Sequence, residues 1–141
     1  MITKAGSAKW MGGLKDGKGT VSTESTALKD QPYGFNTRFE GQAGTNPEEL
    51  IAAAHASCFS MALSMILGQS DLTPEEISTT AKVSMDKDGD GFAVTKSHLT
   101  VAAKVPGASE YDFMNAAEAA KAGCPISKVL NCEITMQATL A

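Results

Sequence analysis

Short alternating stretches separated by turn residues fill the first part of the chain. Residues 8–10 and 20–23 predict two strands, and the glycine-rich sequence between them predicts a turn. Residues 31–34 predict a second turn. Residues 35–39 predict a third strand, with two phenylalanines on one face and Arg38 on the other.

A long helix is the strongest local prediction of the sequence. Asn46 can cap it, and Pro47 suits the first helical position. Residues 50–69 carry no formal charge, and Gly68 can end the helix. The apolar length is also typical of a membrane span, but alanine, serine and a histidine dilute it and no second such segment accompanies it. We therefore expect a helix over 47–67, buried nearly all round, packed on a sheet and against a second copy of itself.

The rest of the chain predicts further strands and helices. Residues 79–85 and 92–105 alternate and predict a hairpin. After them we expect a helix over 110–121 capped by Ser109, a helical turn from Cys124 to Leu130, and a last strand over 133–140. Strands joined by hairpins rather than crossovers predict an α+β fold, and the length predicts a single domain over residues 1–141.

Composition narrows the class of protein. The 12 Lys and Arg against 16 Asp and Glu give a net charge of −4, which offers no basic surface for nucleic acid or an anionic membrane. The 3 cysteines are odd in number and not closely spaced, which argues against a disulfide framework and a CxxC zinc site. The first residues contain no apolar signal core, so we expect a cytoplasmic protein whose cysteines are reduced.

Two loop motifs fail on their context. Residues 12–18 match a phosphate-binding loop, but Gly19 replaces the hydroxyl residue and strand sequence follows, so a hairpin turn is expected. Residues 86–91 match the first half of a calcium loop, but Ser97 stands where a bidentate glutamate is required. We expect a solvated turn there.

The three cysteines differ in their surroundings. Cys132 falls in the last strand and is expected to be a core residue. Cys124 directly precedes a proline and caps a helical turn, where free N–H groups stabilise a thiolate, although a small residue filling a tight corner is an equal alternative. Cys58 follows His55 by one helical turn, which leaves three possibilities open: a metal pair, a Cys–His nucleophile, or a core thiol and a core histidine.

Arg38 and Glu48 favour a functional role for Cys58 over a role as a core residue. Arg38 comes shortly before the long helix, and Glu48 opens it. A guanidinium held by a carboxylate and directed at a thiol stabilises the thiolate at neutral pH. The alternative is an ordinary surface ion pair of little energetic value.

Four segments together resemble the OsmC family, and within it the osmotically inducible branch, which is related to the organic hydroperoxide resistance (Ohr) proteins. The resemblance covers essentially the whole chain and rests on residues 31–40, 44–50, 55–59 and 123–125. It implies antiparallel sheets packed on a long central helix, in an intertwined homodimer whose two active sites draw residues from both chains.

The resemblance also implies an activity. It implies a thiol peroxidase that favours organic hydroperoxides over hydrogen peroxide, without metal or other cofactor, reset by an external dithiol that is lipoyl-type in relatives. By position, Cys58 is the peroxidatic cysteine, Cys124 the resolving one, Arg38 the activator of the thiolate and Glu48 its ion-pair partner. We expect the oxidised Cys58 to form a transient disulfide with Cys124.

Helix geometry sets a condition on these roles. Glu48 lies ten residues before Cys58, about 15 Å along one helix, so direct contact within a straight helix is excluded. We expect Arg38 and Glu48 to reach Cys58 from the partner chain, or Arg38 to span the gap.

Two other functions are the alternatives to a peroxidase. One is a non-enzymatic redox sensor or small-ligand binding protein, and the other is a thiol hydrolase using His55.

Overall fold

The structure is a computed structural model that describes residues 1–141. The chain forms two compact units, which we call the N-terminal unit (Met1–Leu50) and the C-terminal unit (Ile51–Ala141). The single domain expected from the length stays a prediction.

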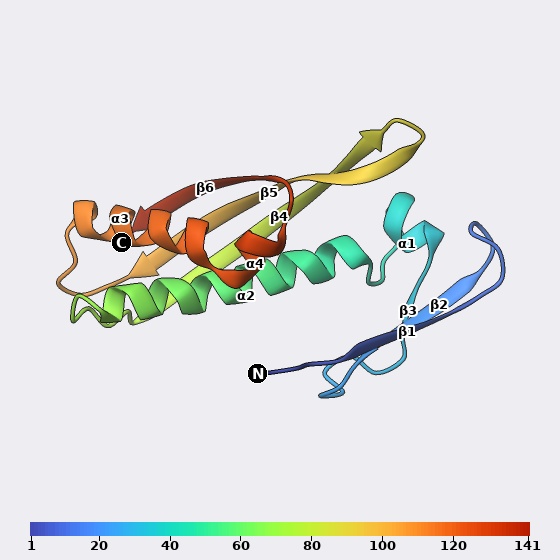
Figure 1. Ribbon diagram of the computed structural model, residues 1–141, viewed down its shortest axis with the longest axis horizontal. Coiled ribbons are helices and arrows are strands. Elements are labelled where there is room, and N and C mark those ends of the chain that lie inside the picture. The colour runs from blue at the N-terminus through green and yellow to red at the C-terminus, as the bar shows by residue number, and fades with distance from the viewer. The chain divides into compact units, whose positions relative to one another are not determined.

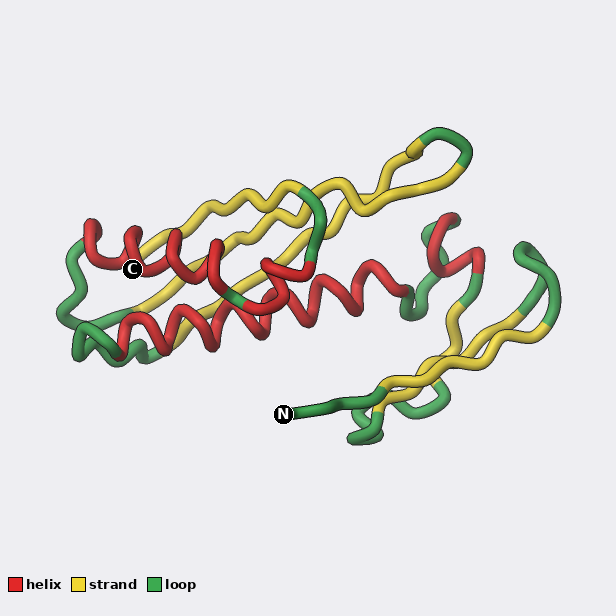
Figure 2. The backbone as a smooth tube through the Cα atoms, in the orientation of Figure 1, coloured by secondary structure: helices red, strands yellow, loops and turns green.

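The N-terminal unit contains a three-stranded antiparallel sheet (Figures 1 and 2). Its strands are β1 (Gly6–Met11), β2 (Lys18–Thr23) and β3 (Gln31–Tyr33). The β1–β2 turn is the hairpin expected in place of a phosphate loop. Gly19 lies between the rings of Trp10 and Tyr33, and a Cβ at this position would come within 2.6 Å of both. Glycine is therefore required here by the packing of the sheet.

Two predictions in this unit are wrong. Residues 31–33 form β3 instead of a turn, and Phe35–Phe39 forms a short helix, α1, instead of a strand. The spacing of four between Phe35 and Phe39 suits both periods, because it places residues on one face of a strand and also on one face of a helix. The helix prevails since the Thr37 hydroxyl accepts from the Gly34 amide at 2.9 Å and the two phenylalanine rings stack at 4.9 Å between centroids.

The long helix α2 (Pro47–Gly68) confirms the strongest sequence prediction. The Asn46 side chain accepts from the Glu49 amide at 2.9 Å, as the capping pattern requires. The helix begins in the N-terminal unit and continues into the C-terminal unit. By length and composition alone it could cross a membrane, although a core helix meets the same criteria.

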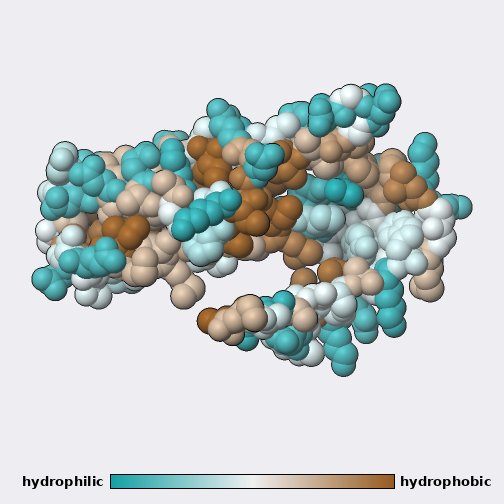
Figure 3. Space-filling view, viewed as in Figure 1, coloured by the Kyte–Doolittle hydropathy of each residue, from teal (hydrophilic) through white to brown (hydrophobic).

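Within one chain α2 is buried on one face only, so burial nearly all round is not observed. The buried side chains recur every fourth residue, as His55, Phe59, Leu63 and Leu67. Met61 and Met65, in contrast, are 76% and 62% exposed. Hydrophobic side chains also gather on the surface over α4 (Pro125–Val129) and the adjoining part of α2 (Figure 3), where Val129 is 72% exposed.

A second three-stranded sheet belongs to the C-terminal unit. Its strands are β4 (Glu76–Asp88), β5 (Gly91–Lys104) and β6 (Glu133–Leu140), in the order β4-β5-β6. Strands β4 and β5 form the expected hairpin, with a turn at the calcium-like motif. Strand β6 pairs parallel with β5. The expectation of antiparallel strands joined by hairpins is therefore corrected for β6 alone. The helices α3 (Glu110–Gly123) and α4 form a crossover, which lets β6 run in the same direction as β5.

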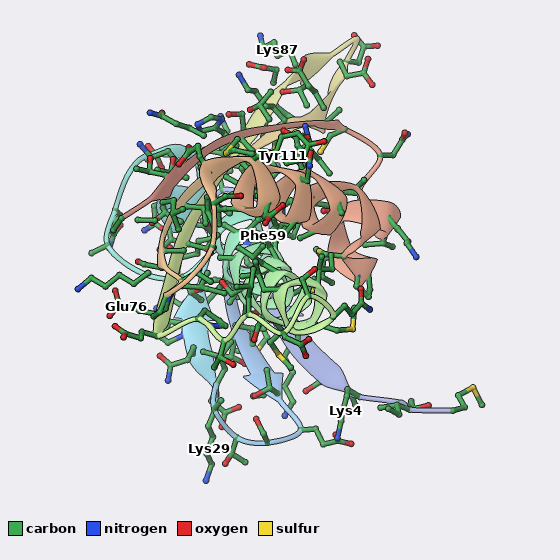
Figure 4. The ribbon with its side chains drawn as sticks, turned by 90° about the vertical axis from the view of Figure 1, so that its left-hand side faces the viewer. Lys4, Lys29, Phe59, Glu76, Lys87 and Tyr111 are labelled. Atoms are coloured by element: carbon green, nitrogen blue, oxygen red, sulfur yellow. The ribbon has the colours of Figure 1, made fainter.

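Helices α2 and α3 cover one face of this sheet (Figure 1). Phe59 of α2 and Phe113 of α3 are fully buried against Leu99 and Val101 of β5. Figure 4 shows Phe59 in the middle of this layer, whereas Lys87 lies at the tip of the β4–β5 hairpin. The interface of helices and sheet is the main core, and both Cys58 and Cys124 lie at it.

Candidate functional site

Two of the three cysteines meet at the core of the C-terminal unit. Cys58 lies in the middle of α2 and is half-buried, and Cys124, between α3 and α4, is fully buried. The two thiols lie close enough for each to shift the pKa of the other. The two cysteines that sequence reasoning selected, far apart in the chain, are thus neighbours in the fold.

Cys124 is held by donors to its sulfur. It caps α4, and both the amide and the hydroxyl of Ser127 lie 3.4 Å from Cys124 Sγ. Burial raises the pKa of Cys124, but the hydrogen bonds from Ser127, Cys58 and the Ile126 amide outweigh burial and lower the pKa below its usual value. The helical cap therefore favours a thiolate at Cys124, one of the two roles that its position before a proline left open.

The surroundings of Cys58 act in the opposite direction. Burial raises its pKa, the hydrogen bond from the Ile126 backbone lowers it, and the neighbouring Cys124 raises it again. The net direction is upward. A nearby positive charge would lower this pKa and favour a thiolate at Cys58.

His55 is fully buried, and both of its ring nitrogens are engaged. Nδ1 lies 2.7 Å from the Ser97 hydroxyl, and Nε2 lies 2.8 Å from the Ser127 hydroxyl. Burial lowers the pKa of His55, which favours the neutral ring. No ring nitrogen is left for Cys58, so this geometry favours neither the His–Cys metal pair nor a nucleophile activated directly by His55.

Arg38 and Glu48 form an ion pair within the N-terminal unit. Arg38 Nη2 lies 2.7 Å from Glu48 Oε1, and Arg38 Nε lies 3.0 and 3.2 Å from the two carboxylate oxygens. The last turn of α1 carries Arg38 and the first turn of α2 carries Glu48. The pairing inferred from the sequence is confirmed, with Arg38 on a helix instead of a strand.

An apolar cavity of about 290 Å³ opens beside Arg38. The aromatic rings of α1 flank it, and the Arg38 guanidinium lies 5.3 Å from the centre of the Phe39 ring. The cavity therefore combines a positive charge with a hydrocarbon surface. Its lining residues are Trp10, Leu14, Tyr33, Gly34, Phe35, Arg38 and Phe39.

Sequence reasoning missed two serines of the site and misplaced one cysteine. Ser127 stands three residues after Cys124, the spacing at which a cap accepts from a helix amide. Ser97 occupies the buried face of β5 among Leu99 and Val101, where a polar residue signals a buried partner. Cys132 lies just before β6 and is half-buried, so its assignment as a core strand residue is corrected.

Comparison with known proteins identifies the family. The family model described as OsmC-like protein matches residues 39–139, which is more than half of the chain. The chain belongs to the OsmC family. It is 60% identical over 135 residues to Peroxiredoxin OsmC of Escherichia coli, a match covering 96% of this chain and 94% of that protein.

More distant relatives carry the Ohr name. Organic hydroperoxide resistance protein-like 2 of Staphylococcus epidermidis is 36% identical over 128 residues, covering 89% of this chain and 87% of its own. The crystal structure of the organic hydroperoxide resistance protein OhrB of Bacillus subtilis aligns with a TM-score of 0.70 at 26% identity, over 96% of this chain and 98% of that one. The resemblance to the OsmC and Ohr proteins, and the α+β fold it implies, are confirmed.

Proposed function

We propose that this protein is a thiol peroxidase that reduces organic hydroperoxides to alcohols. The observation that carries the proposal is the close approach of Cys58 and Cys124 at the core of the C-terminal unit. Paired thiols that contact each other in the reduced fold can be oxidised to a disulfide with little movement of the backbone. Relatives named peroxiredoxin and organic hydroperoxide resistance protein support the same activity.

In the first step the Cys58 thiolate attacks the distal oxygen of the hydroperoxide. The O–O bond breaks, the leaving alkoxide takes a proton to become the alcohol, and Cys58 becomes a sulfenic acid. Cys124 then attacks the oxidised sulfur, giving a disulfide and water. An external dithiol, in our proposal of the lipoyl type, reduces this disulfide by exchange in a cytoplasmic cycle.

The Arg38–Glu48 pair supplies the charge that this first step needs. Its guanidinium stabilises a thiolate and draws electron density from the proximal oxygen as the O–O bond breaks. The aromatic cavity beside Arg38 accommodates the hydrocarbon part of the substrate. This arrangement favours organic hydroperoxides over hydrogen peroxide, which has no apolar part to bury.

In this proposal a homodimer brings the Arg38–Glu48 ion pair of one chain to the Cys58–Cys124 pair of the other. Glu48 and Cys58 lie ten residues apart on α2, about 15 Å of helix rise, which favours an Arg38–Glu48 pair acting on Cys58 of the partner subunit. The exposed methionines of α2, Met61 and Met65, form an apolar surface suited to pack against a second copy. Each dimer then holds two active sites.

Single-turnover oxidation tests the activity and the roles of the cysteines. One equivalent of cumene hydroperoxide is mixed with the wild type and with Cys58→Ser, Cys124→Ser and Cys132→Ser, and the products are quenched and analysed by mass spectrometry. We expect a Cys58–Cys124 disulfide in the wild type and in Cys132→Ser, a trapped sulfenic acid in Cys124→Ser, and no peroxide consumption in Cys58→Ser. Consumption that persists in Cys58→Ser would overturn the assignment.

Mixed dimers test the exchange of residues between chains. Arg38→Ala and Cys58→Ser proteins are each inactive in the proposal, and mixed dimers are formed by subunit exchange. If Arg38 acts across the dimer, each mixed dimer regains one complete site and activity returns. If Arg38 acts within its own chain, the mixture stays inactive, which excludes the arrangement across the dimer.

A further inference from the structure

A chain of buried hydrogen bonds runs from β5 through α2 to the sulfur of Cys124. The Ser97 hydroxyl contacts His55 Nδ1 at 2.7 Å, His55 Nε2 contacts the Ser127 hydroxyl at 2.8 Å, and Ser127 donates to Cys124 Sγ at 3.4 Å. Ser97, His55 and Cys124 are fully buried, and Ser127 is 7% exposed. The peroxidase chemistry described above makes no use of His55, Ser97 or Ser127.

The direction of this chain follows from the donors available. The Ser127 hydroxyl has one proton, which it gives to Cys124 Sγ, so its oxygen must accept from His55 Nε2. His55 is neutral because burial lowers its pKa, so its other nitrogen, Nδ1, accepts from the Ser97 hydroxyl. Every donor and acceptor in this chain then has a partner, and reversing any single link would leave a buried donor or acceptor without one.

We propose that His55 is a positioning residue for the resolving step, holding the Ser127 hydroxyl as a fixed donor to Cys124 Sγ so that Cys124 attacks the Cys58 sulfenic acid as an oriented thiolate. The proposal rests on the peroxidase function proposed above. In this step the S–S bond forms and the S–O bond of the sulfenic acid breaks. The departing hydroxide takes a proton to become water, Cys124 is oxidised and Cys58 is reduced, and no outside electron is required.

The titratable groups near Cys124 are few. Cys58, on α2, lies beside it. His55, also on α2, contacts Ser127 of α4. Lys121 of α3 forms an ion pair with Glu118 at 3.3 Å, and Lys128 lies in the last turn of α4. The pH dependence of the resolving step therefore reports mainly on Cys124, with Cys58 already oxidised when the step occurs.

Rapid-quench kinetics separate the two steps of a single turnover. Ser127→Ala removes the hydroxyl donor, and His55→Phe removes the group that orients it. In both we expect peroxide consumption within about twofold of the wild type, while disulfide formation slows about tenfold, as for loss of a hydrogen bond to an ionised group. The sulfenic acid accumulates and is trapped by dimedone. The midpoint of the pH profile for disulfide formation moves upward by about one unit.

Two further variants distinguish orientation from general packing. His55→Gln retains an N–H close to the position of Nε2, and we expect it to restore most of the resolving rate that His55→Phe loses. Ser60→Ala is the matched control. Ser60 lies on the same helix as His55, and its hydroxyl contacts Thr79 of β4 at 2.7 Å instead of a cysteine. It should leave both steps unchanged.

The outcomes are distinguishable. If Ser127→Ala, folded as judged by circular dichroism, resolves at the wild-type rate with an unmoved pH midpoint, the proposal is wrong, whether or not His55→Phe folds. If the wild type itself forms no sulfenic acid at Cys58, the peroxidase function fails and this proposal fails with it. A normal first step with a slowed and pH-shifted second step supports both.

Discussion

Arg38 and Glu48 form a forked ion pair in which Nε and Nη2 of the guanidinium both lie within 3.0 Å of Glu48 Oε1. The arginine side chain remains 38% exposed, whereas that of the glutamate is 14% exposed. An ion pair with this much solvent contact contributes little to stability. Its geometry instead fixes the direction of the guanidinium, which faces the aromatic cavity.

Substitution of this pair should therefore separate activity from stability. In Arg38→Lys and Glu48→Gln we expect the peroxide-consumption rate to fall at least about tenfold, because a lysine cannot form the fork and a glutamine cannot hold it. The free energy of unfolding should change by less than about 1 kcal/mol. Stopped-flow kinetics and urea denaturation measure the two effects. Glu49→Gln is the neighbouring control, and wild-type kinetics in Glu48→Gln would contradict the assigned role.

The buried His55 should make the fold sensitive to acid. Its pKa is lowered from 6.5 in the folded chain, so below about pH 6.5 the unfolded chain binds a proton that the folded chain refuses. Stability is then lost as the pH falls from 6.5 towards the folded pKa, with a slope of up to about 1.4 kcal/mol per pH unit from this residue. Urea denaturation at pH 7.5 and 5.5 measures the loss. His55→Gln should show a smaller difference, and an equal difference would assign the acid sensitivity elsewhere.

The exposed face of α2 should control assembly. Met61 is 76% exposed in a single chain, so Met61→Glu changes nothing inside the protomer but places a charge in the proposed dimer interface. We expect the dimer dissociation constant to rise about a hundredfold and activity to fall with the dimer, since an unpaired buried carboxylate costs several kcal/mol. Analytical ultracentrifugation measures the constant. Tyr111→Glu, on α3 and 75% exposed, is the control, and an intact dimer in Met61→Glu would place the interface elsewhere.

The contact of α2 with the sheet should dominate stability. Phe59 is fully buried between α2, α3 and β5, so Phe59→Ala leaves a cavity and should lower the free energy of unfolding by about 3–5 kcal/mol. Tyr111→Ala, at an exposed aromatic position, should cost less than about 1 kcal/mol. Chemical denaturation of both variants checks the difference. Similar losses in the two variants would show that the core lies elsewhere.

Local sequence signals predicted an element correctly where its own residues provide the capping residue, the hydrophobic periodicity and the residue that ends it. The capped α2 and the Ser109-capped α3 are such elements, and in both the capping hydrogen bond is present. They were insufficient for Phe35–Phe39, because a pair spaced by four fits a helix and a strand equally. Local signals also could not specify that β6 lies parallel to β5, since the pairing of strands depends on the long-range packing of α3 against the sheet.

By itself the sequence determined the family, the capped helices and the chemical candidates, Arg38, Glu48, Cys58 and Cys124, because these depend on residue types at fixed local spacings. Only the tertiary structure decided which groups meet. It joined Cys58 to Cys124 and surrounded Cys124 with Ser127 and His55, contacts between residues far apart in the chain. A thiol's pKa is set by such neighbours and by burial, which no local pattern encodes.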